Sequence, residues 1–263
     1  MIVLILVLLG LCFGSFVNAL VWRLHEKKNW TTERSICVHC HQVLAWYDLI
    51  PIVSWGLLKG RCRYCNELIS WQYPLVEILT GILFVLSYHY WPFGWGAVGQ
   101  VSFGLWLAMV VVLMALTVYD LRWMLLPNKL VLVFTVLAGL QLVVRLVSEK
   151  DINVLLAAFW GVVCLFGFFY ILFQISGGKW IGGGDVKLGV GLGLLVGGPL
   201  AALLVLFMAS CFGTIVSLPL LIKHKKKATS KIPFGPFLIA ATFIVYIFGT
   251  TLINWYKRQF LLL

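Results

Sequence analysis

Charged residues are scarce in this chain of 263 residues, and acidic ones are the scarcest. There are 20 Lys and Arg but only 9 Asp and Glu, so charged residues make up 11% of the chain, against about 25% in soluble globular domains. Hydrophobic residues make up 62%. So little charge cannot cover the surface of a soluble domain, and so much apolar area excludes a disordered chain. The composition predicts an all-α protein that spans a bilayer.

Two other signals are missing from the sequence. The first apolar run has no basic segment before it and no small-residue cleavage site before Arg23, so we expect no removable signal peptide. No Gly-x-Gly-x-x-Gly fingerprint occurs, because the glycines at 182–184 and 189–193 do not satisfy that spacing. The residues alone therefore identify no segment that would hold a nucleotide-like cofactor.

Apolar runs near the length that crosses a bilayer, about 20 residues, divide the chain into eight expected transmembrane helices. The shortest, 185–196, has 12 residues and is the least certain to cross completely. A polar loop over 23–72 separates the first helix, 1–22, from a polytopic domain over 73–263. The expected spans are Ile2–Trp22, Pro74–Tyr90, Ala97–Tyr119, Leu130–Val147, Val154–Ile175, Asp185–Val196, Leu200–Ile222 and Phe234–Tyr256.

The basic residues predict the orientation of these helices. With eight crossings and both termini outside, 16 of the 20 Lys and Arg fall in cytoplasmic loops, as the positive-inside rule requires. Seven crossings would instead place the Lys223–Lys231 cluster outside. This bias accounts for the net charge of +11, so the expected partner is the lipid bilayer and no nucleic acid is expected.

Four of the seven cysteines form two Cys-x2-Cys pairs in the polar loop, Cys37 with Cys40 and Cys62 with Cys65. Two such pairs are typical of a four-thiolate zinc site. A cytoplasmic loop disfavours structural disulfides, and a loop of this size with little core gains stability from a metal. The pattern predicts a structural zinc with no open coordination position; an iron–sulfur centre or a redox pair is the alternative.

Two acidic residues lie at expected helix ends on the cytoplasmic side, Asp120 and Asp185. Ionisable groups at membrane depth indicate functional sites. Two carboxylates that meet can share a proton, as in aspartic proteases, so that one acts as a general base on water while the other donates a proton. The alternative is that each caps a helix or pairs with a basic neighbour, Arg122 or Lys187.

The residues around this aspartate pair give further candidates for the site. The glycines before Asp185, including Gly182 and Gly184, permit close backbone approach, and Lys187 follows on the same segment. Glu77 lies one turn into the second expected span, where it would either orient a substrate or serve as an interfacial residue. Asn18 is expected to form an interhelical hydrogen bond.

Six motifs in order resemble those of the type IV prepilin leader peptidases, including the competence and type II secretion members. The resemblance covers residues from about 10 to about 240, and His25 and Asn128 stand where members usually have Pro and Asp. The motifs are Gly14–Asn18, the paired Cys-x2-Cys loop, Tyr73–Glu77, Asp120 with Leu126–Asn128, Gly182–Lys187 and Ile232–Phe237.

The resemblance implies a multi-pass protein of the bacterial inner membrane. It implies an aspartyl endopeptidase that removes the leaders of prepilins and pseudopilins after a glycine, on the cytoplasmic side. Asp120 and Asp185 match the catalytic pair, and the four cysteines match the zinc loop. Many members also methylate the new N-terminus with S-adenosylmethionine.

Two functions of other classes remain open from the residues. An ion-coupled transporter would use Asp120, Asp185 and Glu77 as a proton or ion relay beside a broken helix. A non-catalytic assembly factor would use the zinc loop to dock a secretion ATPase or a pilin. Reconstituted flux without cleavage would identify the first, and loss of pilin binding without loss of cleavage after changes at Cys37 and Cys40 would identify the second.

Overall fold

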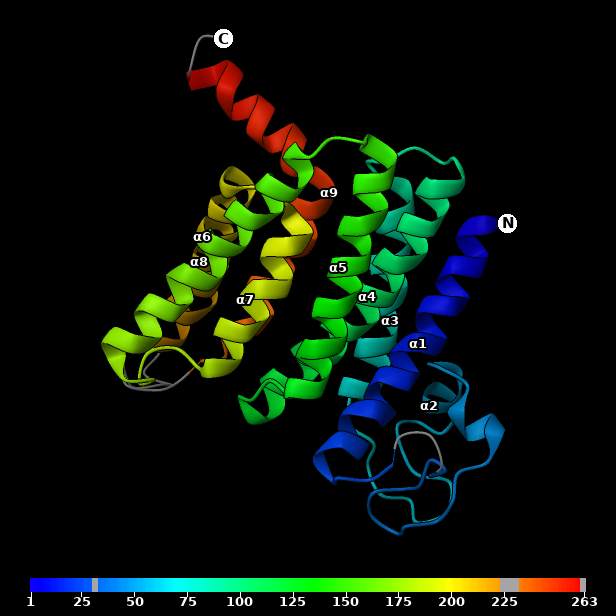
Figure 1. The fold of residues 1–263 in the computed structure, drawn as a ribbon. Coiled ribbons are helices and arrows are strands. Elements are labelled where there is room, and N and C mark those ends of the chain that lie inside the picture. The colour runs from blue at the N-terminus through cyan, green and yellow to red at the C-terminus, as the bar shows by residue number, and fades with distance from the viewer. Residues whose placement is uncertain (30–32, 223–231, 261–263) are drawn as a thin grey trace. The chain divides into compact units, whose positions relative to one another are not determined.

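The computed structural model describes residues 1–29, 33–222 and 232–260, and the Lys223–Lys231 cluster lies outside these ranges. Within them the chain forms helices and two isolated β-bridges, which confirms the all-α class (Figure 1). The helices are α1 (Ile2–His25), η1 (Trp46–Leu49), α2 (Val53–Leu57), α3 (Gln72–His89), α4 (Ala97–Trp123), α5 (Asn128–Glu149), α6 (Asn153–Ser176), α7 (Gly183–Val196), α8 (Pro199–Ile222) and α9 (Gly235–Phe260).

Six of the helices in the described ranges are long and apolar enough to cross a membrane: α1, α4, α5, α6, α8 and α9. The other two expected spans correspond to α3 and α7. The α7 helix has 14 residues, or about 21 Å at the usual helical rise, which is shorter than the apolar core of a bilayer. The multi-pass membrane fold is therefore confirmed, and complete crossing by α3 and α7 stays a prediction.

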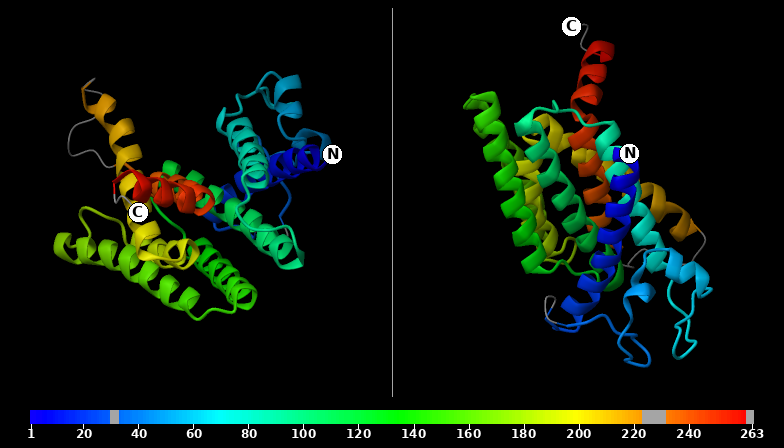
Figure 2. Two further views of the ribbon diagram at one scale, coloured as in Figure 1. Left: turned by 90° about the horizontal axis from the view of Figure 1, so that it is seen from above. Right: turned by 90° about the vertical axis from the view of Figure 1, so that its right-hand side faces the viewer.

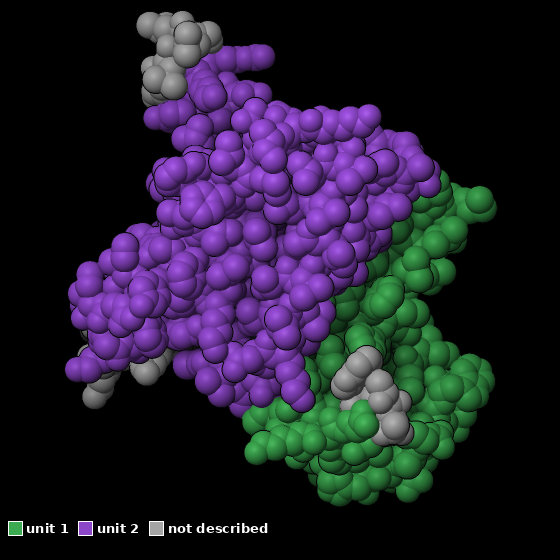
Figure 3. All heavy atoms as spheres, viewed as in Figure 1, with its two compact units in different colours: residues 1–89, 110–118 green, residues 90–109, 119–263 purple. Residues whose placement is uncertain are grey.

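The chain divides into two compact units (Figure 3). Unit 1 comprises residues 1–89 and 110–118, and unit 2 comprises residues 90–109 and 119–263. The four cysteines and Glu77 belong to unit 1, whereas Asp120 and Asp185 belong to unit 2. The division expected from the sequence, with boundaries after residues 22 and 72, stays a prediction.

In unit 1, α1 and α3 lie side by side, as the views in Figures 1 and 2 show. Small residues make this close packing possible. A Cβ added to Gly10 would lie 2.5 Å from Gly81 Cα, and one added to Gly14 would lie 2.5 Å from Glu77 Cα. The two glycines, one helical turn apart on α1, therefore allow the backbones to touch and fix the register between the helices.

In unit 2, α7 packs against both α5 and α6, and its glycines make this arrangement possible. A Cβ on Gly193 would lie 2.5 Å from Val162 Cα of α6, and a Cβ on Gly191 would lie 2.8 Å from the Phe134 ring of α5. Leu192, the residue between them, is fully buried. Glycines on both faces thus let a short helix fit inside the helix cluster and fix the position of its N-terminal turn.

A buried polar cluster joins α4, α5 and α9 within unit 2. Gln141 Nε2 donates hydrogen bonds to Ser102 Oγ and to Tyr246 OH, the second at 2.7 Å. The Tyr246 ring stacks on Trp106 with centroids 4.3 Å apart. Interhelical hydrogen bonds of this kind hold membrane helices together, so the three helices are joined by polar as well as apolar contacts.

Candidate active site and candidate metal centre

Asp120 lies in the last turn of α4. Met124 ends this helix in a left-handed conformation and donates its N–H to the carbonyl oxygen of Asp120 at 2.8 Å. The Asp120 side chain is buried, with 5% of the residue exposed. The backbone N–H of Gly235 donates a hydrogen bond to its carboxylate. The end of α4 and the start of α9 therefore meet at this carboxylate.

Asp185 lies in the first turn of α7, where backbone N–H groups and the helix dipole favour negative charge. Its own N–H donates to the carbonyl oxygen of Gly182 at 3.1 Å, and the Gly182 N–H donates to its carboxylate. The Oδ1 atom is buried and has no hydrogen-bond partner among the described atoms. One carboxylate oxygen is thus fixed by the turn before α7, and the other remains an available acceptor.

The two carboxylates meet at Gly235, in the first turn of α9. A Cβ on this glycine would lie 2.5 Å from Asp120 Oδ2 and 3.6 Å from Asp185 Oδ1. The two oxygens can therefore be no farther apart than the sum of these distances. A water molecule that accepts and donates hydrogen bonds of about 3 Å bridges carboxylates at such a separation. Three helix ends, from α4, α7 and α9, thus build one acidic site.

The structure gives different roles to the other candidate residues beside the aspartate pair, Gly182, Gly184 and Lys187. A Cβ on Gly184 would lie 2.8 Å from Leu126 Cβ, so Gly184 is needed for close packing, whereas a Cβ on Gly182 would make only ordinary contact with Asp185, at 3.5 Å. Lys187 is exposed, and its Nζ donates to Asn128 Oδ1 at 2.9 Å. Lys187 therefore joins α7 to Asn128 at the start of α5.

In unit 1, the two Cys-x2-Cys segments fold into matching turns. Cys37 N–H donates to Gln42 O at 2.9 Å, and Cys62 N–H donates to Glu67 O at 2.8 Å. Each turn is closed by an isolated bridge, Ile36 with Val43 and Arg61 with Leu68. Both turns contain a residue with positive φ immediately after the second cysteine, His41 or Asn66. The same backbone geometry thus presents two thiols from each segment.

The four thiols fit a zinc ion. The Sγ atoms of Cys37, Cys40, Cys62 and Cys65 all lie within 4.8 Å of one another, and Cys37 Sγ lies 3.9 Å from Cys65 Sγ. Tetrahedral ligation with Zn–S bonds of about 2.3 Å requires sulfur–sulfur distances of about 3.8 Å. Four thiolates at these distances surround a metal completely, so the donor set fits a structural zinc.

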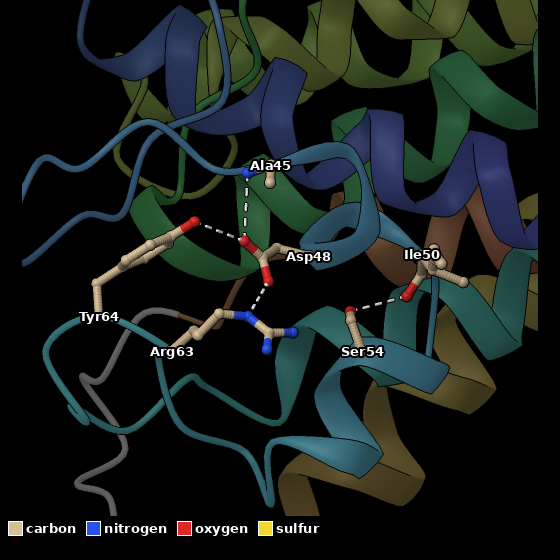
Figure 4. A network of polar contacts seen from close by, with 6 residues as sticks. All are labelled: Ala45, Asp48, Ile50, Ser54, Arg63 and Tyr64. Atoms are coloured by element: carbon tan, nitrogen blue, oxygen red, sulfur yellow. Dashed lines mark hydrogen bonds and ion pairs between the residues drawn. The ribbon is translucent and has the colours of Figure 1, made fainter.

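A second contact network stiffens the cysteine loop (Figure 4). Asp48 accepts hydrogen bonds from Arg63 Nε at 2.7 Å, Tyr64 OH at 3.2 Å and the Ala45 N–H at 3.2 Å. Burial alone would raise the pKa of Asp48, but these hydrogen bonds outweigh it and lower the pKa below its ordinary value of 3.8. The network therefore contributes stability above that pH and is lost only as the pH falls through the lowered pKa.

Glu77 and Asn18 both have partners within unit 1. Glu77 is buried, and its Oε2 accepts the Ile52 N–H at 2.8 Å. Asn18 donates to Tyr73 O at 3.1 Å and accepts from Gln72 Nε2 at 3.2 Å, which confirms its expected interhelical hydrogen bonds. Glu77 therefore joins α3 to the loop before α2.

Gly235 and Asp48 were not predicted as site residues. Gly235 lies in the Ile232–Phe237 motif, and this motif is the signal in the sequence that could have identified it. Its proximity to Asp120, however, arises only when α9 folds against α4. Asp48 and Arg63 are separated by 15 residues, and no spacing rule pairs them. Both contacts depend on tertiary structure.

Two family models match the chain. The model for the bacterial peptidase A24 N-terminal domain matches residues 8–91, and that for the type IV leader peptidase family matches residues 107–218. A prepilin leader peptidase/N-methyltransferase of Aeromonas hydrophila is 32% identical over 97% of this chain and 93% of its own length. The chain belongs to the type IV leader peptidase family.

Other relatives carry similar names. The prepilin leader peptidase/N-methyltransferase of Pseudomonas aeruginosa is 31% identical over 97% of this chain and 93% of its own length. A type 4 prepilin-like proteins leader peptide-processing enzyme of Escherichia coli is 34% identical over 87% of each chain. No solved structure matches.

Within this leader peptidase, the matched ranges divide the candidate residues between the two family models. The N-terminal model spans the four cysteines and Glu77, and the peptidase model spans Asp120 and Asp185. Gly235 lies beyond both ranges. Membership of this family favours a peptidase over the transporter and the assembly factor.

Proposed function

We propose that this chain is an aspartyl endopeptidase of the bacterial inner membrane that cleaves the leader peptides of prepilins and prepilin-like proteins. The observation that carries the proposal is the convergence of the Asp120 and Asp185 carboxylates at Gly235. The names of the relatives supply the substrate class. Cleavage after a glycine on the cytoplasmic side is the finer part of the proposal, and it rests on the sequence motifs and the charge bias.

The aspartate pair performs the reaction by moving protons. One carboxylate, ionised, takes a proton from a water molecule whose oxygen attacks the carbonyl carbon of the scissile peptide bond. The other carboxyl, protonated, donates its proton to the carbonyl oxygen, so that a neutral tetrahedral diol forms. Collapse of this intermediate breaks the C–N bond. The carboxyl that took the proton from water gives it to the leaving amine, and one hydroxyl of the diol returns a proton to the other carboxylate, so that the starting pair is restored. Two close carboxylates hold the single proton that this cycle requires.

The position of the pair near helix ends suits a substrate held in the bilayer. Asp120 lies in the last turn of α4 and Asp185 in the first turn of α7. A prepilin anchored by its apolar helix presents its cleavage bond at the membrane surface, where water is available. We therefore infer that hydrolysis takes place at the inner-leaflet surface, with both termini of the enzyme outside.

We assign Cys37, Cys40, Cys62 and Cys65 to one structural zinc. When bound, the metal would join the two matching turns of the loop and supply no open position for chemistry. The thiol geometry supports this assignment.

Methylation of the new N-terminus is the second activity that we propose, on the names of the relatives. The glycine-rich helix α7 does not fit S-adenosylmethionine, because Gly191 and Gly193 pack directly against α5 and α6 and leave no room for a cofactor. We therefore assign no residue to cofactor binding.

The proposal is tested by incubating the purified chain, reconstituted in lipid vesicles, with a prepilin and S-adenosylmethionine. Asp185→Asn should stop leader removal, and with it methylation, because the new N-terminus never forms. Asp151→Asn is the matched control, since Asp151 is exposed and its carboxylate accepts the Asn153 N–H at 2.9 Å at the start of α6. Mass spectrometry of the pilin distinguishes the products, and full leader removal by Asp185→Asn would refute the assignment.

A further inference from the structure

The loop between α1 and α3 contains an apolar run that the candidate site does not use. Residues 49–58, Leu-Ile-Pro-Ile-Val-Ser-Trp-Gly-Leu-Leu, carry no charge and include α2. The run is followed by Lys59 and Arg61, both exposed. An uncharged decapeptide within an otherwise polar loop requires a structural reason.

The exposed apolar side chains of Val53 and Leu57 form one side of α2, which we call the α2 face. Leu57 is 79% exposed, and Ile50 and Trp71, the second of them 73% exposed, are further exposed apolar residues of the same loop. Val53 and Leu57 lie four residues apart and so share one side of α2. The Trp71 ring lies against Trp55, with centroids 4.2 Å apart, and Trp55 Nε1 donates to Ile69 O at 3.2 Å.

The hydrogen bond between Ile52 and Glu77 sets the depth of this face. The α1 helix carries no charged residue from Ile2 to Trp22, and Gly14 contacts the backbone of Glu77. Gly14 lies eight residues before Trp22, or about 12 Å inside this uncharged segment. Because Glu77 accepts the Ile52 N–H at 2.8 Å, α2 begins at a level that lies within the uncharged part of α1. Figure 1 shows α2 level with the last turns of α1.

The backbone at this contact is strained, which indicates that the surrounding structure fixes it there. Ile52 has φ +61° and ψ −49°, and the Val53 N–H donates to Pro51 O at 2.6 Å. This γ-turn conformation is unfavourable for a β-branched residue. Glu77, which also accepts from Ser15, is held against α1 and so anchors the strained turn.

We propose that the α2 face rests in the interfacial layer of the inner leaflet, so that the loop docks on phospholipid. Exposed apolar faces of this kind mark interaction surfaces, and Trp and aliphatic side chains beside basic residues are typical of interfacial helices. The positive charges of Lys59 and Arg61 are complementary to the anionic lipids of this leaflet. The inner leaflet follows from the proposed orientation of the chain; the docking itself does not depend on peptidase activity.

Photo-crosslinking tests this proposal with the full chain in vesicles of phosphatidylethanolamine and phosphatidylglycerol. A benzophenone amino acid is placed at Leu57, at Leu8 as a lipid-facing reference on α1, and at Tyr64 as an exposed control in the same loop. We expect the yield of phospholipid adducts at Leu57 to match that at Leu8 and to exceed that at Tyr64 several-fold. A yield at Leu57 as low as at Tyr64 would overturn the proposal, as would adducts formed chiefly with added prepilin or with a second copy of the chain.

A second pair of variants tests the role of Glu77 in setting the depth. Glu77→Met removes the acceptor for the Ile52 N–H, and it should lower the adduct yield at Leu57 several-fold while the yield at Leu8 stays unchanged. Glu77→Gln keeps an acceptor oxygen and should restore the yield. An unchanged yield at Leu57 in Glu77→Met would contradict the anchoring of the face by Glu77.

Discussion

Gly235 is the residue on which the geometry of the aspartate pair depends most closely. Its N–H donates to Asp120, and its missing side chain leaves space between Asp120 Oδ2 and Asp185 Oδ1. Both carboxylates lie in terminal turns of their helices, Asp120 at the end of α4 and Asp185 at the start of α7. A single methyl group at residue 235 would therefore enter the position where water has to bind.

Gly235→Ala should reduce prepilin cleavage by about 10²-fold or more, because displacing a catalytic group by about 1 Å can cost that much. Insertion into the membrane should not change. The measurement is the initial cleavage rate in vesicles, with Gly167→Ala as control, since a Cβ on Gly167 meets nothing within 4 Å. Normal cleavage by Gly235→Ala would show that the carboxylates do not require this space.

At the scale of elements, α7 acts as the support that places Asp185. It is short and glycine-rich, and its glycines pack against backbone or ring atoms of α5 and α6. A side chain on these faces would push the helix outward and move its first turn. The glycines after Asp185 therefore serve packing against α5 and α6, and Gly184, before it, serves packing against Leu126.

Gly193→Ala should destabilise the protein by about 1–3 kcal/mol, the usual cost of overpacking, because its Cβ would lie 2.5 Å from Val162 Cα. Thermal unfolding in detergent measures this change. Gly139→Ala, where a Cβ meets nothing within 4 Å, should leave the protein as stable or slightly more stable. Equal melting temperatures for Gly193→Ala and the unaltered chain would contradict the tight packing.

The cysteine loop is the second element with a structural role of its own. Cys62→Ser should lower the zinc content from about one per chain, as expected for a four-thiolate site, and should make the loop more sensitive to protease. Cys164→Ser, in α6, is the control and should retain the metal. Metal analysis of both purified variants checks this, and unchanged zinc in Cys62→Ser would exclude thiolate ligation at that residue.

At the scale of the whole molecule, the sequence predicted the helices better than the contacts between them. Apolar runs correspond to α1, α4, α5, α6, α8 and α9 because burial in lipid requires long continuous apolar segments. The spacing of Cys37, Cys40, Cys62 and Cys65 predicted their gathering because short turns fix it locally. The meeting of Asp120 with Gly235 and of Ile52 with Glu77 could not be derived, because it depends on how helices pack.

The central claim is that Asp120 and Asp185 act as one catalytic unit, and the rate of prepilin cleavage tests it most directly. Asp120→Asn, Asp185→Asn and the double variant should be compared in the same vesicle assay under single-turnover conditions. Residues that share one water and one proton are not additive, so each single variant should lose as much activity as the double variant. A single variant that cleaves at a rate near that of the unaltered chain would contradict the account.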